Sequence, residues 1–171
     1  LSELGVKVRY VEEDFDDTAA GRFALRNMMN VNQFYSDNLA EDVRRGLMDN
    51  ASKCMVNCPC PLGLKKGEDG RFAIDEEGAK IVREIYERVN AGDLFVDIAN
   101  DLNARGIKTS RGNLWKKSSF HYLISNEQYI GTYSYGGIRI DGGIPPVLPK
   151  ELLYAVQEKL KNKKATKRRQ T

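Results

Sequence analysis

Residues 98–136 read IANDLNARGIKTSRGNLWKKSSFHYLISNEQYIGTYSYG, and this stretch decides the fold. Its first part continues a pattern of apolar residues at helical spacing, which predicts a helix over residues 94–105. Gly106 follows as a helix-ending residue, and Asp93 stands where a helix N-cap is expected. The sequence therefore predicts a short helix with an N-cap before it and a glycine that ends it.

The second half of the stretch predicts a further helix and a hairpin. After the polar segment KTSRGNLW, apolar residues at helical spacing predict a helix over residues 117–126. Its apolar residues are Phe120, Leu123 and Ile124. Residues 129–140, YIGTYSYGGIRI, alternate around Gly136-Gly137, which predicts a β-hairpin. Helices in this order, followed by a hairpin, are typical of a winged helix-turn-helix-like module.

Two elements are predicted immediately before this module. Residues 52–70 are expected to form a linker that leads into a short strand pair with a turn around Glu68-Asp69-Gly70, and residues 71–74 are its return strand. A helix then begins at Glu76, with Asp75 as its N-cap and Gly92 in the C-cap position. The helix over residues 94–105 follows this one at once, so the sequence predicts two helices joined by a tight turn.

The two ends of the sequence have their own patterns. Residues 19–51 contain no proline and carry apolar residues at helical spacing, which predicts a helix about 45 Å long at about 1.5 Å per residue. Such a helix cannot bury its apolar stripe alone and is expected to dimerise or to span between domains. Residues 5–13 alternate as a strand, interpreted as the last strand of a domain that began earlier in a longer polypeptide. A final helix is predicted from Glu151 to about Lys161.

The predicted fold class is mainly α with small β, or α+β: a long isolated helix followed by a winged helix-turn-helix-like domain. The predicted division of the chain is a terminal strand and turn, a long helix, a linker, a folded domain and a basic tail. Their bounds are residues 1–18, 19–51, 52–63, 64–162 and 163–171.

Composition bounds the class of protein. Charged residues make up 30% and hydrophobic residues 41% of the 171 residues, which is a globular composition. No stretch approaches the roughly 20 apolar residues that span a membrane, so neither a membrane nor a secretory route is expected. Three cysteines in one short cluster are a poor disulfide framework and favour a reducing cytoplasm.

Charge is strongly polarised along the chain. Residues 105–171 carry 14 basic and 4 acidic side chains, whereas the total charge is only +3. A chain with one basic end suggests a polyanionic partner there, although a solubilising tail has the same composition.

The segment around residues 105–122 has the residue types of a DNA-reading element. A reading helix needs an apolar inner face and small polar or basic residues at its N-terminal end. The candidates at that end are Lys116, Lys117, Ser118 and Ser119, and those just upstream are Lys108, Thr109, Ser110 and Arg111. The alternative is that Ser118 only caps the helix and that the lysines are solvated.

Three stretches resemble the large serine recombinases, the integrases of phages and conjugative transposons. They are FDDTAAGRF, NQFYSDNLAEDVRRGLMDNA, and the run from DEEGAKIVREIYERVNAG through IANDLNARGIKTSRGNLWKKSSFHYLISNEQYIGTYSYG. The third is the most specific, since its Leu-Asn-x-x-Gly-Ile, Thr-x-x-Gly-x-x-Trp and Asn-x-x-Tyr-Ile-Gly motifs follow the order and spacing of that family's recombinase domain.

The resemblance implies site-specific DNA recombination. In that family a serine attacks a DNA phosphate and forms a phosphoserine link, without any cofactor. The nucleophile belongs to an earlier part of the catalytic domain, so no catalytic residue is expected in this sequence and it should not cleave DNA alone. The implied partners are double-stranded attachment-site DNA and further copies of the parent protein, as dimer or tetramer, and no small-molecule substrate.

The resemblance also suggests contacts outside the reading segment. Arg44 and Arg45 on the long helix are candidates for phosphates near the crossover site, beside an acidic Glu41. Asp42 departs from the family, which usually has a basic residue there. Lys53, Lys65 and Lys66 make the linker region positive, and the linker from Asn57 to Gly63 could follow a minor groove.

Three other residue types in the sequence, cysteine, histidine and tryptophan, can contact a metal or DNA. Cys54, Cys58 and Cys60 have spacing unlike paired zinc ligands, and no fourth ligand is near, so no metal is expected. His121 lies on the predicted reading helix, where contact with DNA and a capping or surface role are both open. Trp115 is interpreted as a core anchor under the turn, with base stacking as the alternative.

The sequence therefore predicts DNA binding for site-specific recombination by a serine recombinase of a mobile element. The alternatives are a winged-helix transcription regulator with a dimerising helix, and a scaffold whose basic end binds acidic proteins. Residues preceding this sequence in the gene separate the first two, and a gel shift at graded salt separates both from the third.

Overall fold

The computed structural model describes the backbone of residues 18–169 and the side chains of residues 18–162. Its contacts divide the chain into two units, one ending at Gly46 and the other beginning at Leu47. The strand predicted over residues 5–13 lies outside the described residues, and the helix predicted over residues 19–51 lies within them.

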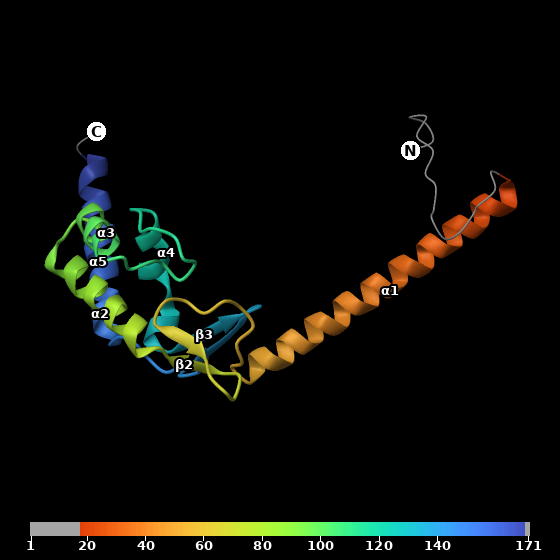
Figure 1. The fold of residues 1–171 in the computed structure, drawn as a ribbon, viewed down its shortest axis with the longest axis horizontal. Helices are drawn as coiled ribbons and strands as arrows, with labels where there is room; N and C mark the ends of the chain where they lie inside the picture. Colours follow the sequence, from red (N-terminus) through yellow and green to blue (C-terminus); the bar gives the residue numbers. More distant parts are fainter. Residues whose placement is uncertain (1–17, 170–171) are drawn as a thin grey trace. The chain divides into compact units, whose positions relative to one another are not determined.

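The long helix α1 spans Ala19–Ser52 and is drawn as one continuous element in Figure 1. Its buried residue is Ala51, in the final turn, which belongs to the second unit. Most of its large apolar side chains are more than half exposed, as expected for a helix that covers no core of its own. These exposed side chains are Phe23, Met29, Val31, Phe34, Tyr35, Leu39 and Val43.

The second unit is built mainly from helices. The helix α2 (Glu76–Ala91) packs against α3 (Phe95–Ala104) and α5 (Lys150–Arg169), and α4 (Ser119–Ser125) also packs on α5. Figure 1 shows α2 and α5 side by side. One contiguous core joins these helices, and its largest fully buried side chains are Tyr86, Tyr129, Tyr133, Phe120, Ile85, Ile98 and Leu102.

Two small antiparallel sheets complete this unit. The strands β1 (Leu64–Lys66) and β2 (Phe72–Ile74) pair as predicted. A 3-10 turn, η2 (Glu127–Ile130), leads into the hairpin of β3 (Thr132–Tyr135) and β4 (Ile138–Asp141). The two-residue loop of this hairpin, Gly136-Gly137, has φ values of 55° and 90°, a conformation that glycine adopts without strain. The predicted α+β class is confirmed.

The predicted cap positions of α2 are confirmed, whereas the predicted N-cap of α3 is wrong. Gly92 ends α2 in the left-handed conformation, with φ 114°, as expected. Asp75 precedes α2 but makes no side-chain cap hydrogen bond. Leu94, not Asp93, is the N-cap of α3, and Asp93 instead accepts a hydrogen bond of 2.9 Å from Arg88 Nε. The Asp93 carboxylate, which the sequence predicts to cap α3, therefore pairs with Arg88 near the end of α2.

Two helix bounds differ from the prediction by more than one residue. The helix α4 begins at Ser119 rather than Lys117, with Ser118 as an N-cap that makes no side-chain hydrogen bond. Lys116 and Lys117 therefore precede the helix, in a turn closed by a hydrogen bond of 2.9 Å from Ser119 N to Lys116 O. The helix α5 continues to Arg169, through most of the stretch that the sequence assigns to a basic tail.

The segment expected to be a linker packs onto the second unit. Val56 N donates to Gly70 O at 2.9 Å, and Tyr133 Oη donates to Met55 O at 2.8 Å. Asn57 Nδ2 donates to Leu47 O at 2.7 Å, which ties the segment to the last turns of α1. Pro61 and Gly63 are buried. These contacts do not fit an extended arm that follows a groove of DNA.

A glycine pair makes the closest backbone approach in this region. A Cβ on Gly78 would lie 2.6 Å from Gly63 N and 2.9 Å from Gly63 Cα. Backbone atoms cannot move aside as a flexible side chain can, so Gly78→Ala is expected to lower the free energy of unfolding by about 1–3 kcal/mol. Unfolding in urea, followed by circular dichroism, measures this change.

The matched control is Gly46→Ala, because a Cβ on Gly46 meets nothing within 4 Å. Alanine is the better helix former by about 0.5–1 kcal/mol, so this variant should not be less stable than the wild type. Equal unfolding midpoints for the two variants would show that the contact between Gly63 and Gly78 is not tight in solution.

Candidate nucleic-acid interface

The loop before α4 and the start of that helix form a region without acidic side chains. No Asp or Glu occurs from Leu102 to Asn126, whereas Lys and Arg occur at five positions. We call four of these, Lys108, Arg111, Lys116 and Lys117, the basic tip. All four are exposed, and none forms an ion pair or a side-chain hydrogen bond within the described part of the chain. Their charge is therefore available to an anionic partner.

The backbone of the basic tip is fixed to α3 by one side chain. Asn103 Oδ1 accepts a hydrogen bond of 2.8 Å from Trp115 N, and Asn103 Nδ2 donates to Trp115 O at 3.0 Å. The Trp115 ring is 4% exposed and lies 5.1 Å, centroid to centroid, from Phe120. Phe120 in turn stacks on Phe95 of α3 at 5.2 Å. The interpretation of Trp115 as a core anchor is confirmed.

A tight turn fixes the first half of the basic tip. Thr109 N donates to Asn113 O at 2.9 Å, and Asn113 N donates to the Thr109 hydroxyl at 3.2 Å. Gly112 N donates to Thr109 O at 2.8 Å, and Gly112 has the left-handed φ of 74°. The Thr109 hydroxyl therefore stabilises the turn, while Ser110 and Arg111 are exposed on it.

The α4 helix is seated by its apolar face. Phe120, Leu123 and Ile124 are buried, and Tyr86 Oη donates to Leu123 O at 2.9 Å. Burial raises the pKa of Tyr86, so its hydroxyl stays protonated and remains a donor. Ser118 and His121 are exposed. Ser119 is half-buried, and its hydroxyl accepts from Lys116 N at 3.2 Å, which gives Ser119 a structural role.

The other predicted contacts lie on separate elements. Lys65 and Lys66 are exposed on β1. Arg44 and Arg45 are exposed on α1, where Arg45 Nη1 lies 3.4 Å from Asp42 Oδ1. Arg44 and Arg45 belong to the first unit, whereas Lys65, Lys66 and the candidates from Lys108 to His121 belong to the second.

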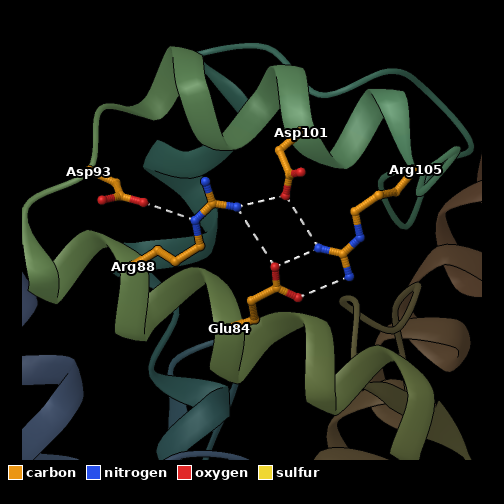
Figure 2. A network of polar contacts seen from close by, with 5 residues as sticks. All are labelled: Glu84, Arg88, Asp93, Asp101 and Arg105. Carbon is orange, nitrogen blue, oxygen red and sulfur yellow. Dashed lines mark hydrogen bonds and ion pairs between the residues drawn. The ribbon is translucent and has the colours of Figure 1, made fainter.

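A network of five charged side chains joins α2 to α3 beside this region (Figure 2). Arg88 Nη1 contacts Asp101 Oδ2 at 2.7 Å, and Arg105 Nη2 contacts Glu84 Oε2 at 3.1 Å. The fifth member is Asp93, paired with Arg88. Arg105 belongs to the acid-free stretch in sequence, but these carboxylates neutralise it, so it is not part of the basic tip.

The network predicts a pH dependence of stability. The hydrogen bond from Arg88 is the main cause that lowers the pKa of Asp101, and Arg105 acts in the same direction. A lowered pKa means that the stabilisation is complete above the ordinary value of 3.8 and is lost as the pH falls below it. The melting temperatures of the wild type and of Asp101→Asn should therefore differ most near neutral pH and converge in acid. A difference that is constant with pH would contradict this account.

Two exposed apolar side chains near the basic tip were missed by sequence reasoning. Leu114 is 59% exposed and Tyr122 is 71% exposed. Charge and small polar residues were the signals used, and neither signal reports an apolar side chain that faces outward. Leu114 directly precedes Trp115, whose side chain is predicted to be buried. Its place next to this anchor is the sequence signal that could have indicated its exposure.

A cavity and the cysteine cluster are weaker candidates for a phosphate or a metal site than the basic tip is for an anion. A cavity of about 320 Å³ lies between the end of α4 and the hairpin, but its Arg139 is paired with Glu127 at 2.7 Å. Burial and the neighbouring Cys58 raise the pKa of the Cys60 thiol, partly opposed by Lys66. Within the described residues, no group of three His, Cys, Asp or Glu side chains is placed to hold a metal ion.

Over the same residues, no helix has the length and apolar content needed to cross a membrane.

The fold and this basic surface agree with the comparisons to known proteins. A family model described as Recombinase matches residues 76–163, so the chain belongs to the Recombinase family. This match covers the module that carries the basic tip and confirms the resemblance to large serine recombinases. No curated protein matches the chain.

Two solved structures share the fold. One is the crystal structure of an LSR–DNA complex, with 21% identity and a TM-score of 0.57 over 71% of this chain. The other comes from a study of the sequence requirements of the Listeria innocua prophage attP site, with 21% identity and a TM-score of 0.55 over 68% of this chain. The chain spans 38% and 50% of the lengths of these two proteins.

Proposed function

We propose that this chain binds double-stranded attachment-site DNA and thereby positions the catalytic domain of a large serine recombinase for site-specific recombination. The observation that carries the proposal is the basic tip: four exposed, unpaired cations on a backbone held by Asn103 and by the turn at Thr109. Cations on a preorganised loop next to a helix are suited to phosphates that flank a groove.

The side chains of α1 support separate roles for the two units within the parent protein. The exposed apolar side chains of α1 suit a further copy of the parent, as a dimer or tetramer. Arg44, next to them on α1, is free of ion pairs within the described residues and is suited to a phosphate near the crossover site. Such a protein would act in the cytoplasm, where cellular DNA and reducing conditions meet.

Gel shifts at graded salt test the proposal on the 171-residue chain. The probes are a duplex with the attachment site of the element that encodes the chain and a scrambled duplex of equal length. Binding should be tighter on the first, and the affinity should fall steeply with salt, since each neutralised phosphate contributes about 0.9 to the logarithmic slope. Absence of a shift on both duplexes at about 50 mM salt would exclude a DNA-binding function.

A further inference from the structure

Leu114 is an exposed leucine on the loop that carries the basic tip. It lies between Arg111 and Lys116 in sequence, and 59% of its surface is accessible. A single exposed apolar residue on a protein surface is ordinary and by itself indicates nothing. Two observations set this one apart: the backbone on each side of it is fixed, and the charged side chains nearest in sequence are all cations without ion-pair partners.

The backbone is fixed by hydrogen bonds on both neighbours of Leu114. Asn113 exchanges two hydrogen bonds with Thr109, of 2.9 and 3.2 Å. Trp115 exchanges two with the Asn103 amide, of 2.8 and 3.0 Å, and its ring is buried. The leucine side chain is therefore displayed outward from a preorganised backbone, so little further ordering of the chain is needed when it contacts a partner.

The chemistry of the partner follows from the surroundings. Four cations select a polyanion, and on duplex DNA they would hold the loop against phosphates on both sides of a groove. An aliphatic side chain held at the centre of such a loop can contribute only where the groove presents an apolar group. In the major groove that group is the 5-methyl of thymine, which the other three bases lack.

We propose that Leu114 contacts a thymine methyl group in the major groove and so makes binding selective for A·T base pairs at one or two positions. This inference rests on the proposed DNA-binding function and adds a specificity-determining residue to it. The basic tip then supplies affinity that is independent of sequence, and Leu114 supplies part of the sequence preference.

The test replaces thymines of the attachment-site duplex, one at a time, by deoxyuridine, which lacks only the methyl group. For the wild-type chain, one or two positions should weaken binding by about fourfold, the factor expected for burying one methyl group. If no position is sensitive, the inference is overturned, whatever any variant does.

Two variants assign the effect to a residue. In Leu114→Ala, the deoxyuridine positions that affect the wild type should change affinity by less than about 1.5-fold, because the methyl group has lost its partner. Leu94→Ala is the matched control, since Leu94 is 63% exposed but precedes α3, outside the basic tip. The control should keep the full sensitivity, and an undiminished sensitivity in Leu114→Ala would overturn the inference.

The outcome also separates this inference from the function on which it rests. A chain that shows no salt-sensitive binding to any duplex contradicts DNA binding itself. A chain that binds with a steep salt dependence, but without a sensitive thymine, keeps the proposed function and excludes only the role of Leu114. Weaker binding by Leu114→Ala without methyl sensitivity would place the leucine against sugar and would likewise exclude thymine recognition.

Discussion

The double variant Arg111→Ala/Lys117→Ala should bind attachment-site DNA about ten- to a hundredfold more weakly at about 100 mM salt. Each of the two side chains is exposed and unpaired in the described structure, so each is available for a phosphate. Loss of two phosphate contacts should also reduce the logarithmic salt slope by about 1.8. Gel shifts at several salt concentrations give both values. Stability should change by no more than about 0.5 kcal/mol, since no intramolecular contact is lost.

The matched control for this variant is Lys80→Ala/Lys150→Ala. Lys80 on α2 and Lys150 at the start of α5 are exposed and lie outside the basic tip, so this control removes the same charge from the same unit. An equal loss of affinity in the control would indicate a general charge effect instead of a defined contact surface. Unfolding of the Arg111→Ala/Lys117→Ala variant, with binding per folded molecule retained, would show that the basic tip is structural.

Trp115→Ala is expected to have the largest effect on stability, about 3–5 kcal/mol. The ring is 4% exposed and packs on Phe120, which itself stacks on Phe95, so its loss leaves a cavity between α3 and α4. Such a loss is a large fraction of the roughly 5–15 kcal/mol that stabilises a domain. Urea unfolding measures the change, and DNA affinity should fall with it because the basic tip loses its anchor.

The control at this position is Trp115→Phe, which keeps an aromatic ring. Trp115 Nε1 is buried and has no hydrogen-bond partner within the described residues, so the variant also removes an unsatisfied donor. We expect it to retain most of the stability and the DNA affinity. A loss as large as that of Trp115→Ala would mean that the complete indole ring is needed at this position and that a smaller aromatic ring cannot hold the loop.

Much of the fold could be predicted because its signals are local. Gly92 ends α2 and Gly136-Gly137 turns the hairpin through backbone conformations that glycine adopts readily. The position of Asp93 could not be predicted in the same way. A carboxylate before a helix can cap it or pair with a cation, and the choice depends on where Arg88 lies in space. The packing of residues 52–63 likewise depends on Tyr133, which is distant in sequence.

For the candidate site too, the residue types could be predicted from the sequence, but their contacts could not. The basic residues were visible in the sequence as a stretch without acidic residues, and their exposure agrees with that interpretation. Which cations are free could not be seen, because Glu84 on α2 neutralises Arg105 across the helix pair. Nor could the sequence show that the Thr109 and Ser119 hydroxyls are occupied by backbone donors. The assignment of single DNA contacts stays a prediction.

The buried indole of Trp115 has a practical consequence. It is the only tryptophan of the chain, and it lies directly beneath the loop that is proposed to meet DNA. Its fluorescence emission therefore comes from that single place, free of signal from any second indole. The protein carries an intrinsic optical reporter of the loop, which can follow association in real time without an attached dye.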